Sequence, residues 1–249
     1  FGYRPPRAKG ASAGDGMKRL MLVIMLMLAA CSSSTTGPSQ PAKDADVREH
    51  ARIPFVTVPA DKVLVIVEEN HSYAQLKAGL PYLWSLAQQF GYATNSRGNY
   101  HPSQPNYVVM VAGSNRGIIT NSYKQISGPS ILGNTIKAGR TAKIVADGMG
   151  TDRCRQSGSS PYAFRHNPWV PFKDERKLCE SQDFDYKYFS SDVAAGKLAN
   201  VEFLIPSGNH NGHDASLKAA EDCVKRALAF VLAGPDWPAG RIAVIFAAE

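Results

Sequence analysis

The sequence has few of the features that mark zinc-binding, nucleic-acid-binding or membrane-spanning proteins. It contains four cysteines in 249 residues, without a CxxC or Cys/His pair at zinc-ligand spacing. Its net charge of +7 owes four charges to the first 19 residues, and no basic stripe with interleaved aromatics follows. The apolar run 20–28 is shorter than the roughly 20 residues that cross a bilayer. We therefore expect no nucleic-acid partner, and no internal repeats are found.

An export signal is predicted near the start of the chain. Met17 begins a segment in which Lys18 and Arg19 precede the apolar core 20–28, which has the length of a signal-peptide core. The core runs into Leu-Ala-Ala-Cys31, which resembles a bacterial lipobox, where the cysteine is acylated and becomes the mature N-terminus. The alternative is an ordinary secretion signal with a chance cysteine at position 31.

These features predict four segments. Residues 1–16 are an upstream extension, 17–31 a lipoprotein signal peptide, 32–60 a flexible tether rich in small and polar residues, and 61–249 one domain. We expect the mature chain to lie in the bacterial cell envelope, held to the membrane by lipid at Cys31. If the lipobox is not used, we expect secretion.

Export changes the reading of the remaining cysteines, because disulfides form outside the cytoplasm. Cys154 and Cys179 would enclose a short loop without secondary-structure signals, and we expect this pair. Cys223 lies within a helical pattern and is expected to be a buried free thiol. Other pairings among the three remain open.

Short apolar runs alternate with amphipathic segments along the domain. Strands are predicted at 62–67, 141–150, 201–206 and 241–248, and helices at 81–91, from about Ser103, and at 214–234. This alternation indicates an α/β fold with a mostly parallel central sheet and helices on both faces. The stretch 151–195 has little periodicity, and we expect it to form a cap bordering the site.

Polar clusters follow three of the predicted strands. They are EENHS after Val67, SGNHNGHD after Pro206, and Glu249 after the last strand. Parallel strands end at one edge, where ligands bind in such sheets. Ser103 stands at a helix start, where free N–H groups favour an anion. The sequence therefore predicts a site where these ends meet.

The residue types at this edge are suited to metal-assisted chemistry. Glu69 and Asn70 offer hard oxygen ligands, and Glu68 should point to the opposite side of the strand. A serine next to a metal can become a nucleophile, so Ser103 is a candidate. The alternatives are an acidic turn for the first pair and an ordinary helix cap for Ser103.

The cluster NHNGHD offers imidazole, amide and carboxylate groups within six residues. These groups could bind a metal or protonate a leaving group, although Asp214 could simply cap the following helix. Arg165 and His166 could contact a phosphate, and a surface ion pair is the alternative for Arg165.

Four motifs in order carry a family resemblance. VIVEENHSY, HPSQPNYVVMVAGS, YAFRHNPW and IPSGNHNGHD resemble those of the bacterial phosphoesterase family of acid phosphatases and phospholipases C. The similarity runs from about residue 62 to 249. It implies an alkaline-phosphatase-like α/β fold, one or more divalent ions (Mg²⁺, Ca²⁺, Mn²⁺ or Zn²⁺), and a serine or threonine nucleophile.

The resemblance also implies roles for single residues. Glu69, Asn70, Ser103 and Glu249 correspond to metal ligands, with Ser103 as the nucleophile and His213 as the group that protonates the leaving group. The expected phosphate contacts are His101, Asn106 and His166. Two positions depart from the family pattern, since Asn211 and Ala248 stand where acids are usual, and we expect the domain to be truncated after Glu249.

Two functions follow from this reading. The first is metal-assisted hydrolysis of phosphate esters, as an acid phosphatase or a phospholipase C, in an exported and lipid-anchored protein. The alternative is a non-catalytic surface lipoprotein that keeps the fold and binds a phosphorylated or lipid ligand.

Overall fold

The computed structural model describes residues 22–26, 60–158 and 160–249. The strands are β1 (Leu22–Leu26), β2 (Lys62–Glu68), β3 (Ala142–Ala146), β4 (Asp183–Asp185), β5 (Val201–Ile205) and β6 (Ile242–Ala248). The α-helices are α1 (Tyr73–Gly79), α2 (Pro81–Phe90), α3 (Ser103–Ala112), α4 (Ile131–Lys137), α5 (Arg176–Gln182), α6 (Phe189–Ala194) and α7 (Leu217–Ala233). Three single-turn helices are η1 (Phe164–His166), η2 (Lys173–Glu175) and η3 (Tyr186–Tyr188).

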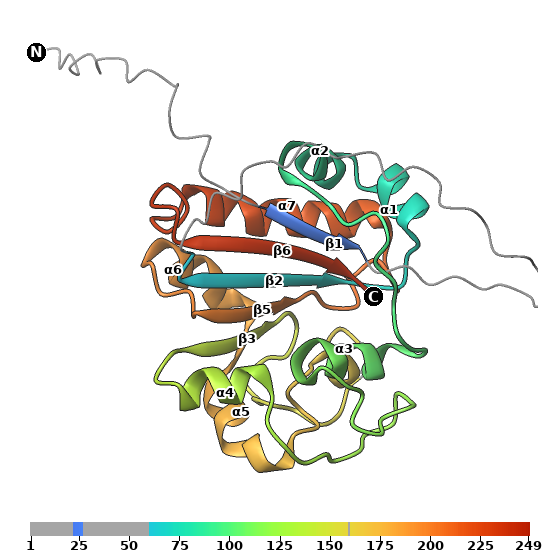
Figure 1. Cartoon of the computed structure of the whole chain (residues 1–249), viewed down its shortest axis with the longest axis vertical. Helices are drawn as coiled ribbons and strands as arrows, with labels where there is room; N and C mark the ends of the chain where they lie inside the picture. Colours follow the sequence, from blue (N-terminus) through green and yellow to red (C-terminus); the bar gives the residue numbers. More distant parts are fainter. Residues whose placement is uncertain (1–21, 27–59, 159) are drawn as a thin grey trace, which may run out of the picture.

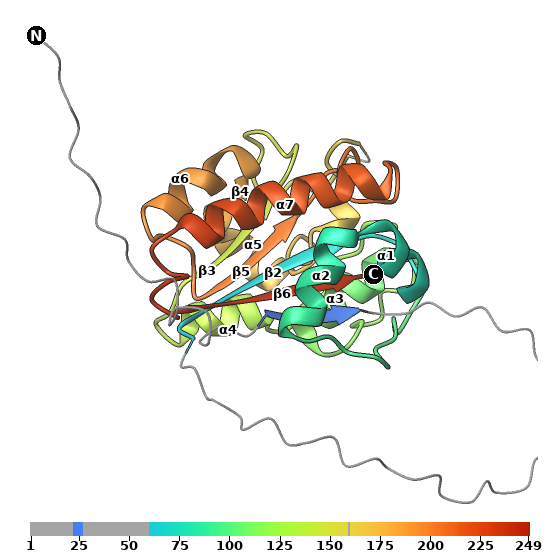
Figure 2. The ribbon, with the colours of Figure 1, turned by 90° about the horizontal axis from the view of Figure 1, so that it is seen from above.

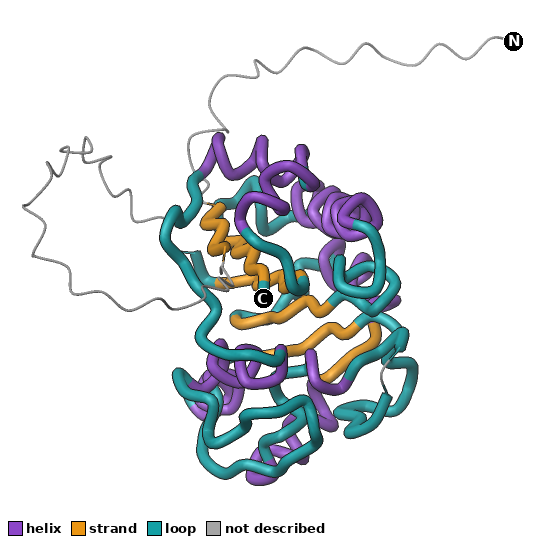
Figure 3. Tube along the Cα trace, turned by 90° about the vertical axis from the view of Figure 1, so that its right-hand side faces the viewer, coloured by secondary structure: helices purple, strands orange, loops and turns teal. Residues whose placement is uncertain are grey.

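The strands form one parallel sheet in the order β1-β6-β2-β5-β3-β4. The first domain strand, β2, lies between β6 and β5, and Leu64, Ile66 and Val67 of its VLVIV run are buried. The arrowheads of β2 and β6 point to one edge, which also holds the C-terminus (Figure 1). Seen toward this edge, the strand ends lie between two groups of helices (Figure 3). The predicted α/β fold with a parallel central sheet is confirmed.

Each face of the sheet is covered by its own apolar cluster. On one face, side chains of β2, β5 and β6 pack with α1, α2, α6 and α7. On the other, side chains of β2, β3 and β5 pack with α3, α4, α5 and the segment 162–172. The view from above shows α6 and α7 on one side and α4 on the other (Figure 2). Helices therefore cover both faces, as predicted, because successive strand residues point in opposite directions.

Several predicted elements differ at their ends. The last helix starts at Leu217 with Ser216 as its N-cap, not at Asp214, and the second strand ends at Ala146. Helices α1 and α4 and the three-residue strand β4 were not predicted from the sequence. The cap 151–195 contains α5 and α6 as well as irregular chain, and β4 joins it to the sheet edge.

The predicted export segments fall largely outside the described residues. These are the upstream extension, most of the signal peptide including Cys31, and nearly all of the tether. Within the predicted signal core, Leu22–Leu26 forms strand β1 and pairs with β6 in parallel. In the described parts of the chain, no helix has both the length and the apolar character to cross a bilayer.

Candidate active site at the carboxyl edge of the sheet

Two acids meet at this edge because of the register between β2 and β6. Glu68 pairs with Ala248, and the Glu249 N–H donates to the Glu68 carbonyl at 2.9 Å. The next residues, Glu69 and Glu249, therefore lie side by side and point toward α3. Glu68 and Ala248 point to the other face, where Ala248 is buried in the cluster with α7.

Helix α3 presents three side chains to these two acids. The Ser103 hydroxyl donates to Glu69 Oε2 at 3.2 Å, and the Tyr107 hydroxyl donates to Glu69 Oε1 at 2.5 Å. Asn106 Nδ2 donates to Glu249 Oε1 at 2.6 Å. Positions i, i+3 and i+4 share one helix face, so the first turn of α3 contacts both carboxylates.

The electrostatic environment of Glu69 is unusual for a carboxylate. Its side chain is 0% exposed, and burial raises its pKa well above the usual range, with the neighbouring charge of Glu249 acting in the same direction. The hydroxyls of Tyr107 and Ser103 oppose this shift because they stabilise the anion. Two adjacent acids on a buried surface favour the presence of a positive charge.

The hydroxyl of Ser103 is not used to cap its helix. Pro102 occupies the N-cap position, without a side-chain cap, and Asn121 Oδ1 accepts from the Gln104 N–H at 3.0 Å. The Ser103 side chain, in a residue 8% exposed, instead faces Glu69. The helix-cap alternative for Ser103 is therefore wrong.

Asn106 has partners other than those predicted. Its Oδ1 accepts from the backbone N–H groups of Asn99 and Tyr100, at 3.1 and 2.9 Å. Its Nδ2 donates to the Tyr100 carbonyl at 2.7 Å and to Glu249. These bonds use both amide hydrogens and both carbonyl lone pairs, so protein groups already satisfy the side chain that was expected to hold phosphate.

His166 lies beneath the site, where it is 2% exposed. Its Nε2 is 3.3 Å from Glu69 Oε1, and its ring stacks on Tyr107 with centroids 5.2 Å apart. Burial lowers its pKa to about 3, and the nearby Arg165 and His213 add to this effect. His166 is thus a neutral imidazole that contacts Glu69.

Three predicted site residues lie nearer the surface. Asn70 follows Glu69 with a φ of 44° and is exposed. His101 is exposed as well, before a cis peptide bond to Pro102. The His213 Nδ1 is 2.7 Å from Asp214 Oδ1, so this acid orients a histidine. Asp214 does not cap α7, because Ser216 does.

Asn211 fixes the loop that carries His213. Its carbonyl accepts from the Glu69 N–H at 2.8 Å, and its Oδ1 accepts from the His213 N–H at 2.9 Å. The residue is 1% exposed. The neutral amide at this position therefore shapes the loop and joins it to the end of β2.

Sequence reasoning missed Tyr107 and also Asp147, which belongs to a second polar cluster. In the latter, Asp147 Oδ2 accepts from the Ser207 hydroxyl at 2.6 Å and lies 2.7 Å from His210 Nδ1. Asp147 follows β3, so the rule applied to the other strand ends would have identified it. Tyr107 could have been found from its position four residues after Ser103.

The donor set of the site fits a divalent cation. Glu69 and Glu249 supply neighbouring carboxylates and Ser103 a hydroxyl, which are ligands for hard ions. The exposed Asn70, which follows Glu69 directly, has an amide oxygen of the same kind. Elsewhere in the described chain, Cys154, Cys179 and Asp183 bring three potential ligand atoms within 4.8 Å. The two cysteines form a disulfide, so this group is not a metal site.

The disulfide anchors the cap that carries His166. Cys154 and Cys179 join the start of the cap to α5, as expected from the sequence, and Cys223 is a buried free thiol. Asp183 Oδ2 accepts from the Cys154 N–H at 2.9 Å and from Asn167 Nδ2 at 2.8 Å. The residue after His166 is thereby tied to the disulfide and to β4.

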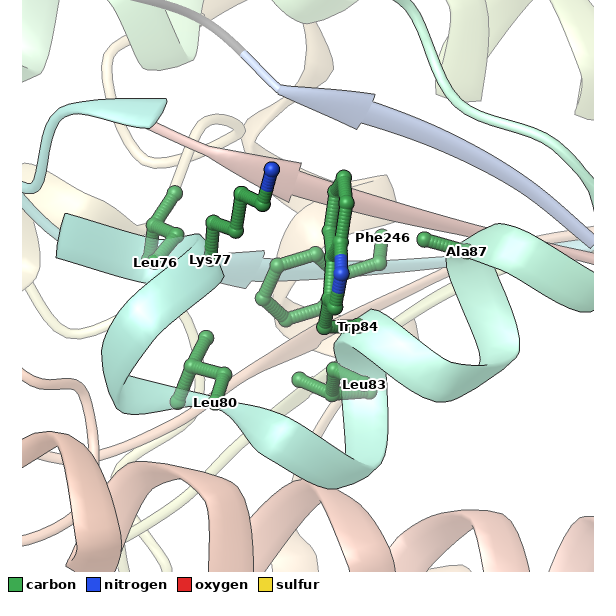
Figure 4. A pocket seen from close by; sticks show the side chains of 7 residues that line it. All are labelled: Leu76, Lys77, Leu80, Leu83, Trp84, Ala87 and Phe246. Atoms are coloured by element: carbon green, nitrogen blue, oxygen red, sulfur yellow. The ribbon is translucent and has the colours of Figure 1, made fainter. Parts of the chain in front are cut away.

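A small apolar pocket lies on the opposite face of the sheet from Ser103. It is formed between α1, α2 and β6 (Figure 4), and its lining residues are Leu76, Lys77, Leu80, Leu83, Trp84, Ala87 and Phe246. Lys77 Nζ lies 4.8 Å from the centre of the Trp84 ring. The pocket contains no acid, hydroxyl or imidazole and belongs to the apolar cluster on that face.

The parallel α/β sheet carries a buried serine and two acids at its carboxyl edge, an arrangement typical of a hydrolase site. The chain belongs to the Phosphoesterase family, whose model matches residues 76–246. The matched range contains Ser103, Asn106, His166 and His213.

Three relatives of the chain carry phosphatase names, which is consistent with this family. The chain is 26% identical over 170 residues to a phosphatidylinositol-3-phosphatase of Mycobacterium tuberculosis, covering 67% of this chain and 56% of the relative. It is 27% identical over 186 residues to a probable acid phosphatase of Kluyveromyces lactis, covering 69% and 43%. It is 25% identical over 235 residues to a phosphate-repressible acid phosphatase of Penicillium chrysogenum, covering 86% and 56%. The chain spans about half the length of these relatives.

Proposed function

We propose that the chain hydrolyses phosphate esters and that Ser103 is the nucleophile. The observation that carries this proposal is the Ser103 hydroxyl at 3.2 Å from Glu69 Oε2, in the first turn of α3. Family membership and the phosphatase names of three relatives support the reaction class.

In the first step, Ser103 Oγ attacks phosphorus and its proton passes to Glu69 Oε2 while the ester oxygen leaves. His213, oriented by Asp214, gives its proton to that oxygen, so the alcohol departs neutral. Water then attacks the phosphorus of the phosphoserine, and the bond between phosphorus and Ser103 Oγ breaks. His213 takes the water's proton, and Glu69 returns its proton to Ser103 Oγ. The N-terminal end of α3 favours the negative phosphoryl group.

Glu69, Asn70, Ser103 and Glu249 would hold a divalent ion at this site. Such an ion supplies neutralisation of the phosphoryl oxygens and a lower pKa for the serine hydroxyl. Glu69 and Glu249 lie close together, and their side-chain hydrogen-bond donors in the described chain are two hydroxyls and one amide, which carry no charge. This pairing of two acids without a cationic hydrogen-bond donor supports the assignment.

We propose a phosphate monoester as the substrate, rather than the phosphodiester cleaved by a phospholipase C. The relatives from M. tuberculosis, K. lactis and P. chrysogenum are all named as phosphatases. The apolar pocket between α1 and α2 faces away from Ser103, so it offers no acyl-chain channel leading to the nucleophile.

The test is release of nitrophenol from p-nitrophenyl phosphate, with and without a chelator. We expect turnover by the wild-type chain, loss with chelator, and loss in Ser103→Ala. Ser85→Ala is the matched control, because Ser85 is a helical serine whose hydroxyl only donates to the Tyr82 carbonyl. Turnover in Ser103→Ala equal to that of Ser85→Ala would rule out the assigned nucleophile.

The alternative, a non-catalytic binding protein, is suggested by Ala248 and Asn211, which stand where acids are usual in the family. The Ala248 side chain faces the cluster with α7, away from Glu69, and Asn211 shapes the loop through its backbone and amide oxygen. Neither residue removes a group that contacts Ser103. The contacts of Ser103 with Glu69 are therefore intact, as hydrolysis requires.

We further propose that the protein is exported and lipid-anchored at Cys31. The basic pair, apolar core and lipobox-like Leu28–Cys31 carry this proposal. Expression in a bacterium fed a labelled fatty acid should label the wild-type chain and not Cys31→Ser. Equal label on both proteins would contradict acylation at this residue.

A further inference from the structure

We propose that Tyr107 is a positioning residue that holds the Glu69 carboxylate in the orientation used by Ser103. This inference rests on the proposed function. It concerns a residue that is 1% exposed and cannot itself reach the substrate.

The geometry is a two-point attachment from one helix. The Tyr107 hydroxyl bonds Glu69 Oε1 at 2.5 Å, and the Ser103 hydroxyl bonds Oε2 at 3.2 Å. Because the donors are four residues apart, they lie one above the other on α3. Fixing Oε1 leaves Oε2 as the oxygen that faces the serine.

In this arrangement no other group of the described site donates a hydrogen bond to Oε1. Glu69 is 0% exposed, so water has no open path to Oε1. The nearest alternative donor is His166 Nε2, which is 3.3 Å away, and it has no hydrogen bond in this arrangement. Without the phenol, Oε1 would lose its hydrogen bond, and either the carboxylate or the His166 ring would have to shift to replace it.

Stacking fixes the tyrosine ring itself. The rings of Tyr107 and His166 are 5.2 Å apart at an angle of 17°. Tyr107→Phe keeps this ring and removes only the hydroxyl. The variant therefore isolates the hydrogen bond from the packing.

The chain offers a matched control for this change. Tyr162 is 2% exposed, packs in the same apolar cluster, and its hydroxyl donates to the Arg155 carbonyl at 3.1 Å. Tyr162→Phe thus removes a buried tyrosine hydroxyl that has no contact with Glu69. We expect both variants to fold, with the larger loss of unfolding free energy in Tyr107→Phe, because its hydroxyl bonds a carboxylate and that of Tyr162 a neutral carbonyl.

The experiment compares kcat and KM for p-nitrophenyl phosphate in the wild type and the two variants. We expect kcat to fall about tenfold or more in Tyr107→Phe alone, with a smaller change in KM, because removing the partner of a ligand typically costs 10–100-fold. A variant with p-aminophenylalanine at position 107 restores a donor and should recover most of the loss. A merely structural role would not produce this recovery.

The Mn²⁺ dissociation constant, measured by calorimetry, gives a second readout. We expect it to rise about tenfold in Tyr107→Phe and to stay unchanged in Tyr162→Phe. Equal kcat in the two phenylalanine variants overturns the positioning role. If the wild type and Tyr162→Phe release no phosphate, the proposed function fails, and the Mn²⁺ measurement alone decides the role of Tyr107.

Discussion

Replacing Asn106 with alanine should weaken the fold and lower kcat without a large effect on KM. Four hydrogen bonds disappear, two from backbone N–H groups of Asn99 and Tyr100, one to the Tyr100 carbonyl and one to Glu249. Neutral bonds contribute about 1 kcal/mol each and the bond to a carboxylate about 2 kcal/mol. Because Asn99 and Tyr100 are exposed, water replaces part of the loss. We expect the unfolding free energy to fall by about 3 kcal/mol.

Urea unfolding followed by tryptophan fluorescence measures this change, and initial rates on p-nitrophenyl phosphate give kcat and KM. The kcat should fall about tenfold, because Glu249 loses the amide that orients it. Asn134→Ala is the control, since Asn134 is an exposed helical asparagine whose side chain makes no hydrogen bond within the described chain. A several-fold rise in KM with unchanged stability would refute this reasoning and restore the direct phosphate contact predicted from the sequence.

Three further outcomes are expected. Reducing the Cys154–Cys179 disulfide, whose cysteines are 25 residues apart, should lower the unfolding free energy by about 3 kcal/mol in urea titrations, and an unchanged midpoint would contradict this. Burial raises the pKa of Asp183 from 3.8 to about 7, so the folded chain keeps a proton that the unfolded chain releases and loses stability as pH rises through that window. The side chain of Asp183→Asn cannot titrate, so the stability of this variant relative to the wild type should rise with pH, by up to about 1.4 kcal/mol per pH unit. Urea unfolding between pH 4 and 7 measures this change. A stability difference that stays constant with pH would refute the raised pKa of Asp183. Glu249→Gln keeps an oxygen for Asn106 but loses the charge, so its Mn²⁺ affinity by calorimetry should fall about tenfold or more, and equal affinity would exclude Glu249 as a ligand.

The sheet could be predicted because its strands are short apolar runs that alternate with amphipathic segments along the sequence. Val63–Val67 and Ile242–Ala247 are such runs, and both become buried parallel strands. Helix α1 was not predicted because its seven residues contain one buried residue, Leu76. Its start is fixed by a capping box between Ser72 and Gln75, and no apolar periodicity marks it.

The candidate site was only partly predictable. Strand ends identified Glu69 and Glu249, and the helix start identified Ser103. Burial was not visible in the sequence, so the positions of His166 and Asn106 below the surface could not be foreseen. Contacts such as the bond of Tyr107 to Glu69 depend on how α3 packs against β2, which local patterns do not specify.

Two different periods determine which side chains meet in the site. Strand side chains alternate, so the pairing of Glu68 with Ala248 places Glu69 and Glu249 together on the face toward α3. Helix side chains recur every 3.6 residues, so Ser103, Asn106 and Tyr107 reach the same two acids. A slip of β6 by one residue would turn Ala248 toward α3 and Glu249 away from Glu69. The apolar residues that fix the register of β6 therefore also determine that the second acid lies next to the first.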